Sequence, residues 1–418
     1  MSVFAGGCAS APTATMAPFP GDAADPAISA VAALPPMGWN SWNTYGCTVD
    51  ESQVRAQADA IVASGMREAG YQYVTVDDCW FDPQRGQDGN LRAAPARFPS
   101  GMRALADYVH SRNLKFGIYE SPNTKTCAQY GGVYPGSTGS SGHEQADARL
   151  FASWGVDYLK YDWCSPNGNV GDQERQFTAM RDALRETGRP IVYSINPNSA
   201  VAGTPPGWRY NWAGIGSMAR ATQDVVAMWN QDDPVSAAIG VGQAISQVAS
   251  LGGRSRAGYW TDPDMLVIGC SSIAGDPYPG LTENESRTQL AMWAMMSAPL
   301  IAGNDTAHMP ERVRALLTDR AVIAVDQDPN TRAGAPISDK RHDVWVKKLA
   351  DGSVAVALYN DSPSDRRIEV DRSAVGAVPA DRYTVTDLWT GARSAGTWPL
   401  GATVGAHDTL MLRLEPAQ

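Results

Sequence analysis

Between residues 35 and 332 the chain repeats one pattern, in which a short apolar segment precedes a longer segment with apolar residues at helical spacing. The short segments are predicted strands because they are apolar, brief and bounded by polar or glycine-rich turns. Eight strands alternating with helices predict an α/β fold, a (β/α)8 TIM barrel. The predicted strands cover 37–42, 71–80, 114–121, 156–164, 190–196, 218–224, 259–266 and 298–305. A doubly wound sheet is the alternative, but no Gly-x-Gly-x-x-Gly follows the first strand.

After residue 333 the pattern changes to an alternation of apolar and polar residues, the period of a strand with one buried face. Turn signals such as Ala-Asp-Gly separate the alternating segments. This pattern predicts a small antiparallel β domain over 333–418. Residues 1–34, with much Ala, Pro and Thr, predict a disordered leader or tether. The catalytic barrel is therefore expected over 35–332. The alternating segments are 344–349, 352–361, 366–370, 383–391 and 402–416.

Charge and composition narrow the possible partners of this 418-residue chain. A net charge of −10 argues against nucleic acid and against an anionic membrane surface. No apolar run approaches the roughly 20 residues of a transmembrane helix. The sequence contains no Cys-x-x-Cys pair, no His-Glu-x-x-His motif and no phosphate-binding loop. We therefore expect neither a metal nor an organic cofactor.

Acidic residues stand at the ends of several predicted strands, which share one face in a barrel. Asp162 is central because a buried strand ends there and a Gly/Asn-rich loop follows. An ion pair with Lys160 or a loop cap is the structural alternative for this carboxylate. Lys160, two residues earlier, points to the same side of the strand and would keep Asp162 ionised or bind a sugar hydroxyl. Most glycosidases use a pair of carboxylates as their catalytic groups. Arg220 precedes Asp224 by four residues, so the arginine could hold substrate near that acid.

Four cysteines each follow a predicted strand, which makes two disulfides and an oxidising compartment possible. Cys8 follows small residues, as in a lipoprotein signal, but lacks the preceding basic and apolar regions. A lipid anchor through Cys8 and a plain leader cysteine both remain open. The protein is expected to be secreted or extracytoplasmic. The four cysteines are Cys47, Cys79, Cys127 and Cys164.

Several motifs together resemble glycoside hydrolase family 27 of clan D, the α-galactosidase family. They run in order over residues 35–416 and include MGWNSW, VDDCW, YLKYDWC, RATQD, WTDPDML and VIAVDQDP. The resemblance implies a barrel followed by a C-terminal β-sandwich. It also implies a retaining mechanism with Asp162 as nucleophile and Asp224 as general acid/base.

The same resemblance implies the remaining site residues. Asp77 and Asp78 would bind the O4 and O6 hydroxyls of a galacto-configured sugar. It also implies the disulfides Cys47–Cys79 and Cys127–Cys164. The other implied substrate contacts are Trp42, Tyr119, Lys160, Asn196, Arg220 and Asp262.

One segment departs from the family pattern and concerns substrate choice. SINPNS at 194–199 replaces the usual Cys-Glu-Trp segment that reads the substituent at C2, and Asn196 falls near the expected Glu. A terminal α-galactoside in an oligosaccharide or glycoconjugate remains the expected substrate. The alternatives are an α-N-acetylgalactosaminide, a β-L-arabinopyranoside or an α-glucan. A non-catalytic sugar-binding barrel and a Schiff-base enzyme using Lys160 are further alternatives. The oligomeric state is not predicted.

Overall fold

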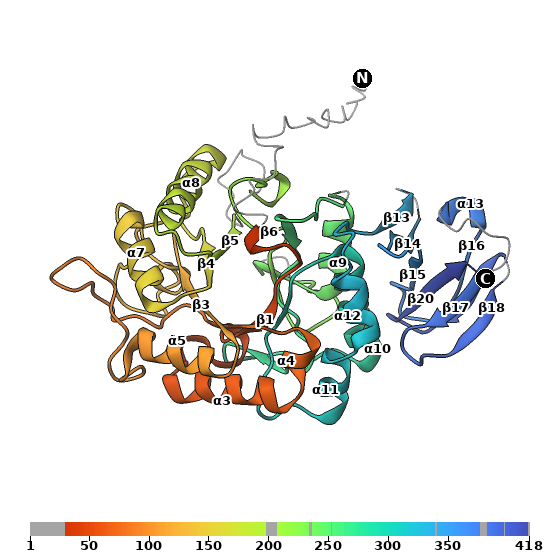
Figure 1. Ribbon diagram of the computed structural model, residues 1–418, viewed down its shortest axis with the longest axis horizontal. Helices are drawn as coiled ribbons and strands as arrows, with labels where there is room; N and C mark the ends of the chain where they lie inside the picture. The colour runs from red at the N-terminus through yellow and green to blue at the C-terminus, as the bar shows by residue number, and fades with distance from the viewer. Residues whose placement is uncertain are drawn as a thin grey trace, which may run out of the picture.

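The computed structural model describes residues 30–197, 207–233, 236–251, 253–338, 341–376, 383–396 and 398–416. A curled parallel sheet surrounded by helices forms the first unit, and an antiparallel β unit follows it (Figure 1). Cys8 and the rest of residues 1–29 lie outside the described residues.

Eight parallel strands form the barrel sheet in the order β12-β1-β2-β3-β4-β5-β6-β9. The sheet closes just beyond β9, where Leu266 forms a parallel bridge with Ala302 of β12. The predicted TIM-barrel class is therefore confirmed. The strands are β1 (Met37–Asn40), β2 (Tyr73–Val76), β3 (Lys115–Glu120), β4 (Tyr158–Asp162), β5 (Val192–Asn196), β6 (Met218–Arg220), β9 (Trp260–Asp262) and β12 (Leu300–Ala302).

The sixth strand is shorter than the predicted 218–224, because β6 ends at Arg220. Asp224 begins the separate strand β7 (Asp224–Val225), which pairs with β8 (Ala238–Ile239). In an extended strand, residues four apart are separated by about 13 Å. Arg220 and Asp224 form an ion pair at 2.8 Å instead, so the chain must turn between them. This turn carries the Asp224 carboxylate out of the barrel sheet.

Helices cover the outside of the barrel sheet (Figure 1). The predicted helix 51–70 is divided at Gly65, whose φ of 83° is the left-handed conformation that ends α3. Asp50 begins α3 with a capping box to Gln53. The main helices are α3 (Glu51–Ala63), α4 (Met66–Ala69), α5 (Gly101–Ser111), α7 (Glu144–Trp154), α8 (Val170–Glu186), α9 (Val241–Ala249), α10 (Glu283–Met296), α11 (Glu311–Leu317) and α12 (Arg320–Asp326).

Residues 30–34, assigned from sequence to the leader, contact the barrel. Ala32 is buried with Tyr73, Tyr158 and Met218 at the amino ends of the strands. The Ala32 carbonyl accepts a hydrogen bond of 2.8 Å from the indole N–H of Trp260. These residues therefore cover the end of the barrel opposite the strand tips. The domain boundaries themselves remain predictions.

The C-terminal unit consists of a six-stranded antiparallel sheet in the order β13-β14-β15-β20-β17-β18 and the pair β16-β19. Its own apolar core includes Val356, Leu358, Ile368 and Leu412. The predicted strand 402–416 is two strands, β19 and β20. Their bounds are β13 (Ala335–Ser338), β14 (Arg341–Lys348), β15 (Val354–Tyr359), β16 (Arg366–Val370), β17 (Tyr383–Asp387), β18 (Arg393–Gly396), β19 (Leu400–Val404) and β20 (Thr409–Pro416).

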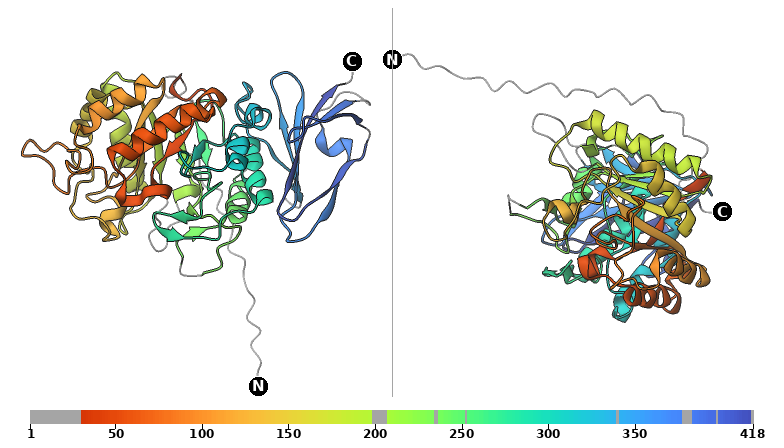
Figure 2. Two further views of the ribbon diagram at one scale, coloured as in Figure 1. Left: turned by 90° about the horizontal axis from the view of Figure 1, so that it is seen from below. Right: turned by 90° about the vertical axis from the view of Figure 1, so that its left-hand side faces the viewer.

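Helix α10 contacts both units, and Figure 2 shows the blue β unit at one end of the molecule. On the barrel side the Trp293 indole N–H donates to the Asp264 carbonyl at 2.9 Å. On the other side Arg287 pairs with Asp408, and the Thr288 hydroxyl donates to the His407 carbonyl at 2.8 Å. The two units therefore share one buried helix.

Candidate active site

A cavity of about 230 Å³ opens at the carboxyl ends of the barrel strands. The structure brings eight of the ten sequence-predicted catalytic and substrate-binding residues to its wall. Asn196 and Asp262 are the two that do not line it. The eight are Trp42, Asp77, Asp78, Tyr119, Lys160, Asp162, Arg220 and Asp224.

Asp77 and Asp78 follow β2 and are almost fully buried at the base of this cavity. One oxygen of Asp77 accepts from the Asn40 amide at 2.6 Å and from the Lys160 ammonium at 2.8 Å. Asp78 accepts from the backbone N–H of Ala128 at 2.9 Å. Burial, reinforced by the neighbouring Asp77 charge, raises the pKa of Asp78 to about 6. Both carboxylates are thus held in fixed directions.

Asp162 ends β4 beside Lys160, as its position in the sequence predicts. The Lys160 Nζ lies 3.5 Å from Asp162 Oδ2, and its shorter contact is to Asp77. Asp162 Oδ1 is buried with no hydrogen-bond partner among the described residues. Burial raises the pKa of Asp162 to about 7, with Lys160 acting in the opposite direction. At neutral pH the Asp162 carboxyl group is therefore close to half ionised, and one of its oxygens accepts no hydrogen bond from the described residues.

The Lys160 ammonium is buried between two carboxylates, and this environment keeps it charged. Burial lowers its pKa, but the charges of Asp162 and Asp77 outweigh burial, so the pKa lies above the usual value. A Schiff-base lysine needs a neutral amine, which this environment disfavours. Two roles were predicted for Lys160, an ion pair inside the barrel and a position at the substrate cavity. The structure shows both, because Lys160 pairs with Asp77 and Asp162 and also lines the cavity.

Arg220 connects Asp224 to Asp264, a residue that the sequence analysis did not select. Its two terminal nitrogens lie 2.8 Å from Asp224 Oδ1 and 2.9 Å from Asp264 Oδ1. Asp264 also accepts from the backbone N–H of Val225 at 2.7 Å. Its φ of 80° is an uncommon conformation for a non-glycine residue. The signal in the sequence that could have identified Asp264 is its position as the second aspartate of Asp-Pro-Asp at 262–264.

Asp224 differs from the other carboxylates in its exposure. Its side chain is 67% exposed, against 8% for Asp162 and 3% for Asp77. Neighbouring groups partly desolvate the Asp224 carboxylate, which acts to raise its pKa, but the Arg220 charge acts more strongly and the pKa lies below its usual value. Asp224 thus stands at the mouth of the cavity, whereas Asp162 lies at its base.

Asp262 and Asn196 lie behind the cavity wall. Asp262 accepts from the Asp264 backbone N–H at 2.8 Å, and burial raises its pKa to about 6. Asn196 is paired in register with Asp162 and is buried, with its Oδ1 unpartnered among the described residues. The remainder of the predicted C2-reading segment, from residue 198, lies outside the described residues.

Two disulfides connect loops that carry the site, as predicted. Cys47–Cys79 links the segments after β1 and β2, and Cys127–Cys164 links those after β3 and β4. Cys79 directly follows Asp78, and Cys164 lies two residues after Asp162. Each bond therefore restrains a loop that begins with a cavity carboxylate.

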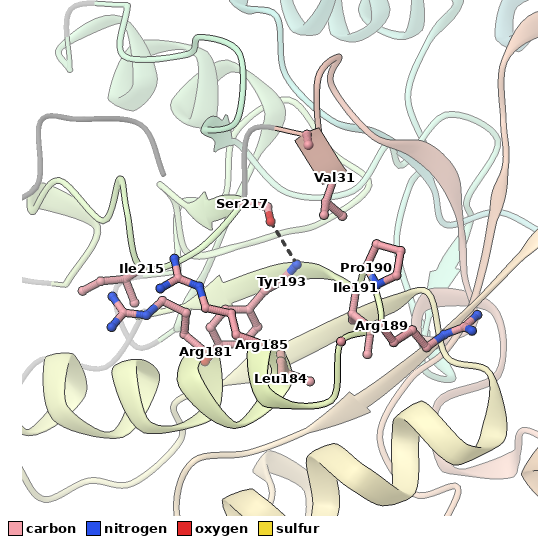
Figure 3. Close-up of a pocket in the computed structure, with 12 residues that line it drawn as sticks. Val31, Arg181, Leu184, Arg185, Arg189, Pro190, Ile191, Tyr193, Ile215 and Ser217 are labelled. Atoms are coloured by element: carbon pink, nitrogen blue, oxygen red, sulfur yellow. Dashed lines mark hydrogen bonds between the residues drawn. The ribbon is translucent and has the colours of Figure 1, made fainter. Parts of the chain in front are cut away.

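A larger cavity, of about 540 Å³, lies at the amino ends of the strands between α8 and Val31 (Figure 3). Arg181, Arg185 and Arg189 line it, together with apolar side chains and no carboxylate. This cavity thus lacks the two carboxylates that glycoside hydrolysis requires. Within the described ranges, no group of three His, Cys, Asp or Glu side chains could hold a metal ion. No helix in the described part of the chain is long and apolar enough to cross a membrane.

Both units of the chain match families of alpha-galactosidase domains. Residues 34–328 match the family described as Alpha galactosidase A, and residues 339–414 match the alpha galactosidase C-terminal beta sandwich domain. The chain is 38% identical over 400 residues to alpha-galactosidase A of Cellvibrio japonicus, covering 92% of this chain and 93% of that protein.

Solved structures agree with the sequence relatives. Alpha-galactosidase I from Mortierella vinacea superimposes with a TM-score of 0.82 at 31% identity, covering 92% of this chain and 98% of that one. The alpha-galactosidase from Saccharomyces cerevisiae with raffinose gives a TM-score of 0.80 at 27% identity, covering 94% and 100% of the two chains.

Proposed function

The chain belongs to glycoside hydrolase family 27, the α-galactosidase family, and on this premise we propose that it releases terminal α-linked galactose with retention of configuration. The observation that carries the proposal is the placement of Lys160 between Asp77 and Asp162. One ammonium thereby connects a hydroxyl-binding carboxylate to the attacking carboxylate.

In the first step, the unengaged oxygen of Asp162 attacks the anomeric carbon and forms a covalent glycosyl-enzyme. Asp224 gives a proton to the departing glycosidic oxygen, which requires bound substrate to raise the pKa that Arg220 lowers in the free site, so that Asp224 is protonated for this step. In the second step, Asp224 removes a proton from water, which attacks the anomeric carbon and releases Asp162. The exposure of Asp224 suits both tasks, because the leaving group and water reach the cavity through its mouth.

Asp77 and Asp78 supply the proposed preference for the galacto configuration. Their carboxylates are fixed by Asn40, Lys160 and Ala128, so a hydroxyl must meet them in one geometry. A buried polar group left unpaired by the wrong epimer is costly, which makes such contacts selective. We propose that they bind the hydroxyls at C4 and C6 of galactose.

A panel of nitrophenyl glycosides tests the proposed substrate. The panel contains the α-galactoside, α-N-acetylgalactosaminide, β-L-arabinopyranoside and α-glucoside, with Asp162→Ala as the blank. We expect the α-galactoside to be cleaved with the highest kcat/KM, and proton NMR to detect α-galactose first. First appearance of β-galactose would contradict retention.

A different sugar is the second candidate because of one observation, the buried Asn196 at the end of β5. If the panel favours the N-acetylgalactosaminide or arabinopyranoside, the mechanism stands and the SINPNS segment sets the specificity. Cleavage of none of the four would support the non-catalytic barrel.

We further propose export from the cytoplasm, because disulfides persist in oxidising compartments. The two disulfides beside the cavity support this proposal. Lipid anchoring through Cys8 is a separate proposal about a residue outside the described range. Fractionation of expressing cells into medium, periplasm, cytosol and membrane tests both.

A further inference from the structure

The proposed general acid, Asp224, stands on a segment outside the barrel sheet. Strand β6 ends at Arg220, and Asp224 begins β7, a strand of two residues that pairs with β8. A general acid must lie within hydrogen-bond reach of the oxygen that it protonates. A displacement of about 1 Å can lower the rate about 10²-fold. The contacts that hold the acid-bearing segment, residues 224–229, therefore bear on the proposed reaction.

The backbone of the acid-bearing segment is attached to a neighbouring hairpin of the barrel unit. Strands β10 (Ser272–Ile273) and β11 (Asp276–Pro277) form this hairpin. The N–H of Gly280, just after the hairpin, donates to the carbonyl of Ala227 at 3.0 Å. Because this bond joins two backbone groups, it holds the middle of the segment without the help of a side chain.

Trp229 ends the acid-bearing segment with a large buried side chain, of which 8% is exposed. Its carbonyl accepts a hydrogen bond of 2.9 Å from the N–H of Gly242 in α9. A Cβ at position 242 would lie 2.8 Å from the indole, so the close approach of helix and ring needs glycine there. The barrel unit thus supplies one surface for the indole.

The C-terminal unit supplies further contacts to the same indole. His407, in the turn between β19 and β20, stacks on Trp229 with ring centroids 4.4 Å apart and ring planes 11° apart. The centroid of the Tyr359 ring in β15 lies 6.3 Å from the indole. Two rings of the C-terminal unit therefore pack on one side chain of the acid-bearing segment.

His407 is itself held in a fixed orientation. A hydrogen bond of 2.9 Å joins its Nδ1 to Oε1 of Glu285 on α10, and this nitrogen carries the proton because a carboxylate only accepts. The His407 carbonyl accepts from the Thr288 hydroxyl at 2.8 Å. Its φ of 50° lies in the left-handed region, which histidine and asparagine adopt more readily than most residues. The imidazole is thus a rigid support for the indole.

We propose that His407 is a positioning residue for Asp224 and acts through Trp229. The inference rests on the proposed galactosidase mechanism and goes beyond it, because it gives the C-terminal unit a part in proton transfer to the leaving group. His407 and Trp229 lie outside the described cavity wall. Their effect on the reaction must therefore pass through the acid-bearing segment.

The test compares phenyl α-galactoside with dinitrophenyl α-galactoside. Phenoxide is a poor leaving group and needs the proton of the general acid, whereas dinitrophenoxide departs almost without it. We expect His407→Asn, which removes the stacked ring and tolerates the backbone conformation, to lower the phenyl-to-dinitrophenyl ratio of kcat/KM about tenfold. A smaller amount of folded enzyme would lower both rates equally and leave this ratio unchanged.

Two further variants sharpen the test. Glu285→Gln is isosteric and weakens the hydrogen bond that orients the imidazole, so we expect the ratio to fall about threefold. This variant keeps the test available if His407→Asn does not fold. Asp408→Asn is the matched control, because Asp408 follows His407 directly and pairs with Arg287 of α10 across the same interface. It should leave the ratio unchanged.

Asp224→Ala is the reference for the loss of the acid and should lower the ratio most. If it does, but His407→Asn and Glu285→Gln lose equally on both substrates, the positioning role of His407 is overturned and the proposed function stands. A fall of the ratio in Asp408→Asn as large as in His407→Asn would also overturn that specific role. Equal losses in Asp224→Ala would overturn the proposed acid, and a wild-type enzyme that cleaves neither galactoside would overturn the proposed function.

Discussion

Lys160 and Lys347 both have largely or fully buried side chains among the described residues, and their surroundings differ. Lys160 in the candidate active site lies between the carboxylates of Asp77 and Asp162. Lys347, on β14 of the C-terminal unit, reaches into the barrel and donates to the Ser297 hydroxyl at 2.7 Å and the Ala294 carbonyl at 3.0 Å. Its third acceptor is the Val325 carbonyl. Lys160 is in contact with two carboxylates, whereas the hydrogen bonds of Lys347 go to neutral oxygens, with Asp326 and Asp328 close by.

The difference appears in the pKa values. Burial acts downward on both lysines, but the two carboxylates raise the pKa of Lys160 above its usual value. Burial lowers the pKa of Lys347 to about 8, because the opposing charge of Asp326 is too weak to compensate. Burial of a charged group therefore does not by itself identify a functional site. The charges facing it distinguish a catalytic network from an anchor between units.

Removing the Asp162 carboxylate, which lies beside Lys160, should have the largest effect on activity. Asp162→Ala deletes the proposed nucleophile, so we expect kcat to fall about 10⁴-fold or more on all galactosides. Thermal unfolding followed by circular dichroism should stay close to the wild type, since one oxygen of Asp162 is unpartnered in the described structure. Activity above one per cent of wild type would argue against the nucleophile.

Lys160→Met should disable the active site next most strongly. We expect kcat/KM to fall about 10²- to 10³-fold, because two carboxylates lose their shared cation. Lys160 lowers the pKa of Asp162, and Asp162 can act as the proposed nucleophile only when it is ionised. The pH below which kcat/KM declines should therefore move upward in the variant. A pH–rate profile with an unmoved acid limb would contradict this role.

Lys347→Met is the matched substitution at the other buried lysine. It leaves three oxygens without their donor, so we expect the free energy of unfolding to fall by about 2–4 kcal/mol. The value of kcat/KM should remain within about twofold of wild type, since Lys347 lies outside the cavity wall. Urea unfolding and a nitrophenyl α-galactoside assay measure both. If the two methionine variants lost the same property, the comparison would fail.

The smallest expected effect concerns Asp326, which faces Lys347. Burial raises the pKa of Asp326 to about 8. Between about pH 4 and pH 8 the folded chain keeps a proton that the unfolded chain has released, so wild-type stability declines as pH rises through this window. The asparagine in Asp326→Asn does not titrate, so the variant lacks this pH-dependent loss of stability.

The stability of Asp326→Asn relative to wild type should therefore increase steadily between pH 5 and pH 8. Urea unfolding at the two pH values measures the difference. A difference that does not change with pH would mean that Asp326 titrates normally.

The same comparison explains where sequence reasoning succeeded. The barrel was predictable because its strands are short apolar runs that end in polar groups, and Asp77, Asp78 and Asp162 stand at such ends. Residues at neighbouring strand ends must meet in a barrel. The position of Asp224 was less predictable, because an ion pair with Arg220 and the pairing of β7 with β8 are tertiary choices.

Lys347 and the hairpin were missed for different physical reasons. In β14 the alternation places Val344 and Val346 on one face and Trp345 and Lys347 on the other, which resembles a solvent-facing side. The second face instead packs against the barrel, as the burial of Trp345 and Lys347 shows. The hairpin around Asp276 and Tyr278 has strands of two residues, too short for a periodic signal.

Helix α10 has a consequence for building chimeras from members of the family. Because Arg287 and Thr288 bind the C-terminal unit while the Trp293 indole donates to the carbonyl of Asp264 in the cavity wall, the helix belongs to neither module alone. A graft that exchanges only residues 333–418 would bring a foreign surface against these side chains. A productive crossover should therefore lie before α10, so that the helix is transplanted together with the partner strands that it evolved to meet.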